Sequence, residues 1–338
     1  EYTKLMGMSK PTPPLHITVR TDLSKEQQEQ LDIRLPFLSP RIHRAKGNIQ
    51  SLDVGSIQPG NRKIKDFSKQ KKREIVFTDI LTDEEDHTTE LETILEPIFA
   101  SVVGYIARKI VLDVRVLGHF DCICSKMREY IETRLFEEPV CADDENILRN
   151  LCESVVRKFL IDEFKKALNA LTVKNADTVH VTGEIRVSQA MPQVVSYQDH
   201  LFPTKSLLTP LIGDSDLELE FAKSLDCYKD IVSFAKNRPL GVNFYMEYQT
   251  QNGSIARYYP DFIVKKSDEE IWIIETKGLE TTEAPGKFKR LLQWCQDATE
   301  YDQNGKNQYN ALYVVEDEWE EYRPSSFAEL CELFRPGE

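Results

Sequence analysis

Three residues in the last third of the sequence have the types and the spacing that metal-assisted hydrolysis needs. Asp261 follows a proline, whereas Glu275 and Lys277 lie two positions apart at the end of the apolar run 271–274. If the two segments form a hairpin whose turn is centred near Asp268, Asp261 and Glu275 lie opposite each other with about 5 Å between their Cβ atoms. Lys277 then points to the same side of its strand as Glu275. Two carboxylates and an amine are therefore expected to converge.

The two carboxylates repel each other, and their burial beside an apolar strand is costly unless a cation pairs with them. A divalent cation resolves this conflict. The expected ligands are oxygens of Asp261, Glu275 and the Thr276 carbonyl, which favour Mg²⁺, with Mn²⁺ as a substitute, over zinc. Such an ion acidifies a water and stabilises charge on phosphoryl oxygens. Lys277 can hold that water or neutralise developing charge, so the chemistry predicted is phosphodiester hydrolysis.

An ordinary half-buried salt bridge is the alternative interpretation, in which Asp261 and Glu275 hold Lys277 without a metal. A Pro-Asp pair followed at roughly 8 to 20 residues by Glu-x-Lys arises by chance in about one chain in twenty of this length. The surrounding sequence lowers the probability of a chance match, because the second half of the motif ends an apolar strand and a helix with acidic residues precedes it.

The elements expected to position these residues have the order helix, three strands, helix, strand, helix. The first helix is expected to begin after Asp214 or Ser215, either of which can cap it. The periodicity predicts helices over residues 216–236, 284–300 and 326–334, and strands over residues 242–250, 256–265, 270–277 and 311–315.

Four segments also occur in a specific order: residues 218–225, 232–237, 258–264 and 272–278. Together, over roughly residues 207–316, they resemble the C-terminal nuclease domain of type III restriction enzyme subunits, and Trp294-Cys295 fits the same pattern. The resemblance implies an α/β (α+β) fold with a PD-(D/E)xK restriction-endonuclease-like αβββαβ core and a mixed central sheet. It also implies that Asp261, Glu275 and Lys277 are the catalytic residues of a DNA endonuclease.

The same resemblance makes Glu218, on the first helix, an additional acidic contributor to catalysis. Glu220 is the competing choice, because residues two apart on a helix face apart and cannot easily reach one site together. A solvated helix acid without any role is the third interpretation of Glu218.

Residues 34–42 and 52–57 resemble, more weakly, the segment that joins motor and nuclease in those subunits. The sequence departs from the full family because it has neither a G-x-x-x-x-G-K-[ST] loop nor a D-E-x-H box. We therefore expect a helicase/ATPase domain or subunit elsewhere, and the start at Glu1 rather than methionine suggests a piece of a longer polypeptide. By the resemblance, a DNA methyltransferase subunit would read the bases of double-stranded DNA in an antiviral restriction system.

Before the nuclease region we expect an extended, basic connector over residues 1–75 and a helix-rich accessory domain over residues 76–200. The connector contains ten basic and two acidic residues between positions 41 and 73, although the whole chain carries a net charge of −13. That segment is interpreted either as a solvated linker or as a phosphate contact. In the accessory domain we expect helices over residues 90–111 and 144–171 and strands within 110–123 and 178–195, followed by a linker over 196–214.

The composition excludes several other classes of protein. No apolar run has the length that a bilayer demands, the first residues do not form a secretion signal, and the seven cysteines contain no C-x-x-C pair. We expect a cytoplasmic protein without a membrane partner. The rival functional hypotheses are a catalytically silent adaptor that couples a helicase motor to DNA or to a modification subunit, and a structural domain without any role on nucleic acid.

Overall fold

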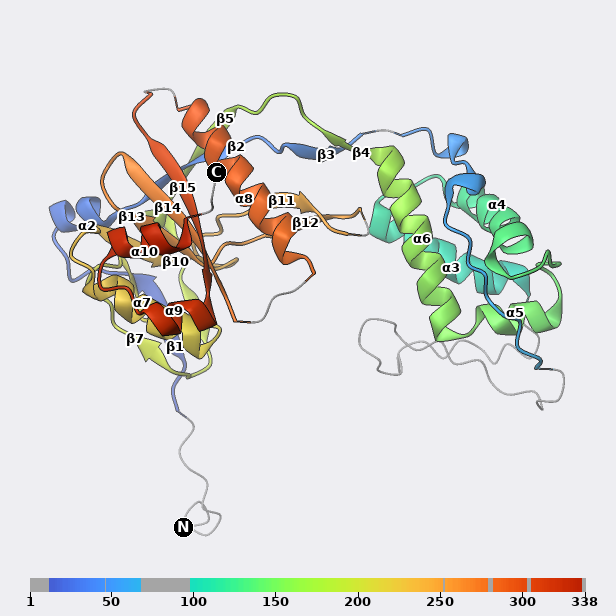
Figure 1. Cartoon of the computed structure of the whole chain (residues 1–338), viewed down its shortest axis with the longest axis horizontal. Helices are drawn as coiled ribbons and strands as arrows, with labels where there is room; N and C mark the ends of the chain where they lie inside the picture. Colours follow the sequence, from blue (N-terminus) through green and yellow to red (C-terminus); the bar gives the residue numbers. More distant parts are fainter. Residues whose placement is uncertain are drawn as a thin grey trace, which may run out of the picture. The chain divides into compact units, whose positions relative to one another are not determined.

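The computed structural model describes residues 12–45, 47–67, 98–251, 253–278, 282–302 and 305–335. The chain divides into two compact units (Figure 1). Unit 1 takes its residues from Glu1–Arg41, Ala176–Tyr248 and Ala256–Glu338, and unit 2 from Ile42–Asn175 and Gln249–Ile255. Unit 2 is therefore inserted into the sequence of unit 1.

The unit boundaries differ from the three consecutive segments expected, 1–75, 76–200 and 201–338. The reason is strand pairing over long sequence distances. Strand β1 (Leu15–Val19) pairs with β6 (Gln193–Val195) and β8 (Leu208–Thr209), and β2 (Arg34–Leu38) pairs with β5 (Val181–Arg186). These ladders make the amino-terminal residues part of unit 1, together with the segment that contains Asp261 and Glu275.

Residues 196–214 are also part of unit 1, and the interpretation of this segment as a linker is wrong. Besides β8, it contains β7 (His200–Leu201) and β9 (Leu211–Ile212), which pair with each other. The strands are too short to produce a recognisable alternation of apolar and polar residues.

Unit 2 is mainly helical and has its own apolar core. Its elements are β3 (Ile42–Arg44), α3 (Phe99–Val114), α4 (Phe120–Tyr130), a π-helical turn (Ile131–Leu135), α5 (Glu145–Leu151), α6 (Ser154–Thr172) and β4 (Val173–Asn175). The expected helix over 144–171 is two helices, broken at Cys152 and Glu153. The prediction of a strand within 110–123 is wrong, since this stretch contains the end of α3 and the start of α4. Positions 68–97, which include the start of the other expected helix and the end of the basic segment, lie outside the described residues.

The site region of unit 1 is built on a four-stranded mixed sheet with the order β10-β13-β14-β15. Strand β13 (Phe262–Lys265) is antiparallel to both β10 (Ser233–Lys236) and β14 (Glu270–Lys277), whereas β15 (Gln308–Val315) runs parallel to β14. The remaining elements of unit 1 are α2 (Lys25–Leu31), α7 (Asp216–Cys227), β11 (Met246–Gln249), β12 (Ile255–Tyr258), α8 (Ala284–Glu300), α9 (Glu316–Tyr322) and α10 (Phe327–Phe334).

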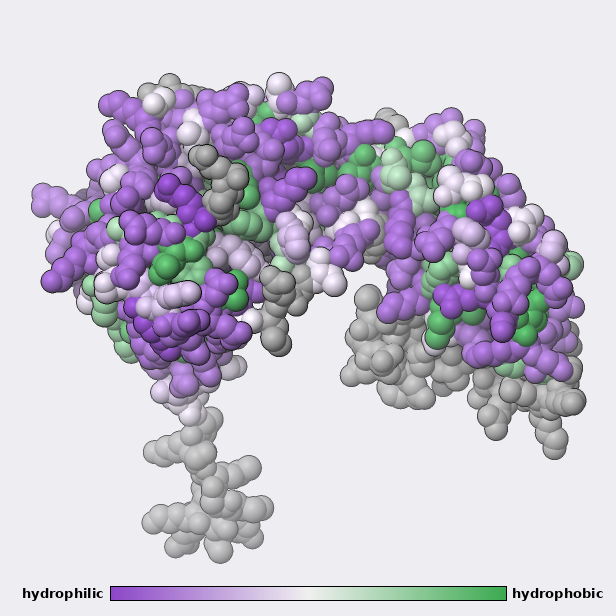
Figure 2. Space-filling model, viewed as in Figure 1, coloured by the Kyte–Doolittle hydropathy of each residue, from purple (hydrophilic) through white to green (hydrophobic). Residues whose placement is uncertain are grey.

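The sheet is covered on both faces, which explains why most residues of its strands are buried. On one face, Ile263 and Ile273 belong to the same core as Leu291 of helix α8. On the other face, Phe262 contacts Phe221 of helix α7, with ring centroids 5.4 Å apart, in a core that also includes residues of α9 and α10. Hydrophilic side chains predominate on the face of the chain seen in Figure 2.

The mixed α/β class and the mixed sheet expected from the sequence are confirmed. The hairpin register is also as expected, because Phe262 lies opposite Ile274, which centres the turn on Asp268. The helix predicted over 216–236 is wrong beyond Cys227, since residues 233–236 form strand β10. The strand predicted over 256–265 is divided at residues 259–261 into β12 and β13, because proline interrupts a ladder.

Candidate active site

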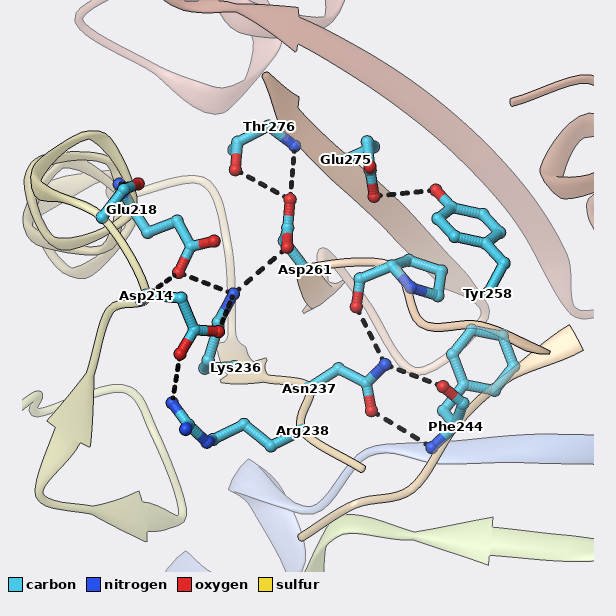
Figure 3. A network of polar contacts seen from close by, with 12 residues as sticks. Asp214, Glu218, Lys236, Asn237, Arg238, Phe244, Tyr258, Asp261, Glu275 and Thr276 are labelled. Atoms are coloured by element: carbon cyan, nitrogen blue, oxygen red, sulfur yellow. Dashed lines mark hydrogen bonds and ion pairs between the residues drawn. The ribbon is translucent and has the colours of Figure 1, made fainter. Parts of the chain in front are cut away.

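Asp261 lies immediately before strand β13, at the end of the ladder with β14. Because Phe262 is opposite Ile274, continuation of the register places Asp261 opposite Glu275. The Asp261 carboxylate reaches over the strand end, and its Oδ2 accepts hydrogen bonds from the backbone N–H and the hydroxyl of Thr276, both at 2.8 Å (Figure 3). Thr276 thus orients Asp261 through donors, which is a contact that the sequence analysis did not foresee.

Asn237 holds the backbone around Asp261 through hydrogen bonds. Its buried amide donates hydrogen bonds to the carbonyl oxygens of Phe244 (2.7 Å) and Pro260 (2.8 Å), and its Oδ1 accepts one from the N–H of Phe244 (3.1 Å). The backbone N–H of Asn237 donates to the carbonyl of Asp261 at 2.8 Å. The turn that presents the carboxylate is therefore held from the neighbouring strand, as Figure 3 shows.

Glu275 is buried on strand β14, with 8% of its surface exposed. The hydroxyl of Tyr258 donates to its Oε2 at 2.9 Å, and among the described residues no donor reaches its Oε1. Burial, followed by the negative charge of Asp261, raises the pKa of Glu275 to about 7, and the Tyr258 hydrogen bond only partly opposes this rise. The carboxylate therefore holds its negative charge at a cost in free energy.

Lys277 is half-buried at the end of β14, two residues from Glu275. Its charge lowers the pKa of Glu275, so the two groups lie within electrostatic reach of each other. Among the described residues, neither Asp261 nor Glu275 forms an ion pair with Lys277. The arrangement thus differs from the simple salt bridge that is the alternative interpretation of the motif.

Glu218 lies in the first turn of helix α7, and its carboxylate is close to that of Asp261. Ser215 caps this helix by accepting a hydrogen bond from the N–H of Glu218, and the N–H of Asp214 donates to Glu218 Oε2 at 2.6 Å. Burial raises the pKa of Glu218, and the charge of Asp261 adds to the rise. Glu220, by contrast, has a half-exposed side chain paired with Lys223, so the structure directs Glu218 and not Glu220 towards Asp261.

Lys236 is a member of this cluster that the sequence analysis missed. Its ammonium lies 2.8 Å from Glu218 Oε2 and 3.2 Å from Asp261 Oδ1, with a longer contact of 3.8 Å to Asp214 (Figure 3). Burial acts to lower the pKa of Lys236, but the negative charges of Asp261 and Glu218 outweigh burial and raise it. The sequence signal for this contact was a lysine directly after the mostly apolar stretch 231–235, since buried lysines are rare unless they are paired.

The donors present suit a hard cation better than zinc, because the carboxylates of Asp261 and Glu275 offer only oxygen. Within the described ranges, no group of three or more His, Cys, Asp or Glu side chains is arranged to hold a metal ion. An ion at this place would therefore complete its shell with backbone oxygen and water, as Mg²⁺ commonly does. A separate hollow of about 1130 Å³ is lined partly by Lys265 and Tyr309, and none of these acids lines it.

Comparison of the chain with protein-family models, with curated proteins and with solved structures found no match. In the part of the chain that the structure describes, the helices are too short or too polar to cross a membrane.

Proposed function

We propose that unit 1 is a Mg²⁺-dependent DNA endonuclease of the PD-(D/E)xK kind. The observation that carries this proposal is the hairpin register, in which Phe262 lies opposite Ile274 and which, continued by one residue, sets Asp261 opposite Glu275. Glu275 is buried and has no ion pair among the described residues. Two such groups repel each other, and a divalent cation is the partner that removes the repulsion.

Asp261, Glu275 and the Thr276 carbonyl would hold the ion. When bound, Mg²⁺ supplies acidification of a water and charge stabilisation on the phosphoryl oxygens. The protein keeps the carboxylates in place through the donors of Thr276 on Asp261 and of Tyr258 on Glu275. The flexible ammonium of Lys277, which has no ion-pair partner among the described residues, can position the attacking water or neutralise charge that develops on the phosphate.

Double-stranded DNA is the proposed substrate, in a cytoplasmic antiviral system related to type III restriction. A helicase/ATPase in the same polypeptide or in a partner would bring the DNA to the site, and a methyltransferase subunit would read the sequence. Glu218 would contribute to catalysis as the acid that lies next to Asp261 from helix α7.

The test is cleavage of plasmid DNA by the purified chain in the presence of Mg²⁺. We expect cleavage by the wild type and a loss of about a thousandfold in both Asp261→Ala and Lys277→Ala, which corresponds to about 4 kcal/mol of transition-state stabilisation. Asp268→Ala, which removes an aspartate with a 90% exposed side chain from the same hairpin, is the matched control and should cleave at the wild-type rate. Full activity in the first two variants would refute the proposal.

A catalytically silent adaptor is the second candidate. It is favoured by the observation that the described residues contain no cluster of three metal-binding side chains. In that case the chain would bind double-stranded DNA but cleave it with neither Mg²⁺ nor Mn²⁺, and Asp261→Ala would leave DNA affinity unchanged.

A further inference from the structure

Asp261 lies near two other carboxylates, Glu275 and Glu218, and the two pairs differ in whether a cation contacts both members. Its negative charge raises the pKa of Glu275 on one side and of Glu218 on the other. The pair with Glu218 has a cation in contact with both members, because Lys236 lies within 3.2 Å of each. Among the described residues, the pair with Glu275 has none.

Lys236 has the features of a fixed cation and not of a surface lysine. Only 5% of its side chain is exposed, and its ammonium lies 5.1 Å from the centre of the Phe262 ring. It extends from strand β10, whose residues Phe234 and Lys236 pair with Val264 and Phe262 of β13. A backbone held in a ladder, a buried stem and two carboxylate partners leave the ammonium little freedom to move.

We infer that Lys236 takes the place of a second metal ion, so that the site binds one divalent cation between Asp261 and Glu275 and excludes another between Asp261 and Glu218. The inference rests on the proposed function. It makes Lys236 a positioning residue, which neutralises Glu218 and leaves Glu275 as the carboxylate that needs an added cation. Glu218 accordingly contacts Lys236 and does not ligate the ion.

The lysine and a second ion cannot coexist at this place. The ammonium already lies at hydrogen-bond distance from Glu218 Oε2 and Asp261 Oδ1, which are the oxygens that the ion would have to share. Like charges a few ångströms apart in a buried site repel strongly. Removal of the amine, with the carboxylates unchanged, should therefore open a second cation position.

The experiment counts Mn²⁺ ions bound per chain at pH 8, from the electron paramagnetic resonance signal of free Mn²⁺. We expect one ion in the wild type and two in Lys236→Met. Lys265→Met is the matched control, because Lys265 is a similarly buried lysine of the neighbouring strand. Its amine contacts the exposed Asp268 carboxylate and the Gln30 and Asp32 carbonyls instead of the site acids. This control should bind one ion. Fluorescence of the three tryptophans, all in unit 1, shows whether each variant is folded.

Glu218→Gln provides a second measurement if Lys236→Met does not fold, since it keeps the shape of the side chain. If Glu218 contacts the lysine and not the ion, this variant still binds one Mn²⁺ and its affinity falls by less than about tenfold. A larger loss of affinity would identify Glu218 as a metal ligand and overturn the inference.

The outcomes separate this inference from the proposed function. Two ions in the wild type, or one ion in a folded Lys236→Met, overturn the role of Lys236 and leave the endonuclease proposal intact. A folded wild type that binds no Mn²⁺ removes the proposed function, and the inference with it.

Discussion

The pKa of Glu275 leads to a prediction about stability that does not depend on finding the substrate. The folded protein raises this pKa from the ordinary value of 4.5 to about 7, through burial and then through the charge of Asp261. Between these two pH values the folded state holds a proton that the unfolded state has lost. The folded state is therefore destabilised as pH rises through this range, and Glu275→Gln, which cannot ionise, should escape that loss.

The magnitude follows from the difference between the two pKa values. At about 1.4 kcal/mol for each pKa unit, the full cost of ionising Glu275 in the folded chain is about 3.5 kcal/mol. Between pH 5 and pH 8, Glu275→Gln should gain about 2 to 3 kcal/mol in unfolding free energy relative to the wild type. The comparison of the two proteins at each pH cancels the contributions of the other titrating groups.

The assay is urea unfolding followed by tryptophan fluorescence at pH 5, 6, 7 and 8 without divalent ions. All three tryptophans lie in unit 1, so the signal reports the unit that contains the site. At pH 8, Mg²⁺ at about a hundred times its dissociation constant should stabilise the wild type by about 3 kcal/mol, and Glu275→Gln much less.

A difference in unfolding free energy between the two proteins that stays constant from pH 5 to pH 8 would contradict a raised pKa of Glu275. A change with the opposite sign would also contradict it, since it would mean that the fold stabilises the charged form of Glu275.

Three further predictions concern the same residues. In a pH–rate profile, cleavage should increase as Glu275 loses its proton, and Tyr258→Phe should move this increase to higher pH by about half a pH unit to one pH unit, because Glu275 loses its hydrogen-bond donor and its pKa rises. Asn237→Ala should lower the unfolding free energy in urea by about 2 to 4 kcal/mol, because buried backbone groups lose their partners. Titration calorimetry should show that Mn²⁺ affinity falls about tenfold for each pH unit below 7 and is constant above pH 8, since the proton on Glu275 competes with the ion.

The hairpin that presents Asp261 and Glu275 was predictable because its information is local. The apolar run before Glu275 and the polar turn at 266–269 fix both the strand and its register, and the observed pairing of Phe262 with Ile274 agrees with them. A short antiparallel pair needs no knowledge of distant residues. The position of Lys277 relative to Glu275 follows from the same alternation along one strand.

Strand β10 was not predictable in the same way. Its sequence, Ser-Phe-Ala-Lys, is buried at every position, and such a strand shows no alternation that would distinguish it from the end of a helix. Phe234 continues the helical spacing of the apolar residues before it, so the periodicity extended the helix too far. What makes this segment a strand is its ladder with β13, about 30 residues later in the chain.

The choice between Glu218 and Glu220 also required the structure. Both acids lie on the first turns of the same helix, and the sequence shows only that they face apart. The choice depends on which helix face packs on the sheet, and this is set by Leu217 and Phe221, whose side chains are buried in the core beside β13. Glu218 is drawn inwards next to them, whereas Glu220 remains with Lys223 in solvent.

The charge balance of the cluster connects the two properties proposed for Glu275. Glu218, Asp261 and Glu275 would carry three negative charges if all were ionised, and Lys236 supplies one positive charge in direct contact with two of them. The negative charge that Lys236 does not neutralise is greatest at Glu275, where the positive charges of Lys277 and Lys287 act only from a distance. The site can reduce this excess negative charge by binding a proton, which is the physical meaning of the raised pKa, or by binding a divalent cation. Proton affinity and metal affinity at Glu275 therefore have one cause, and a change that weakens one should weaken the other.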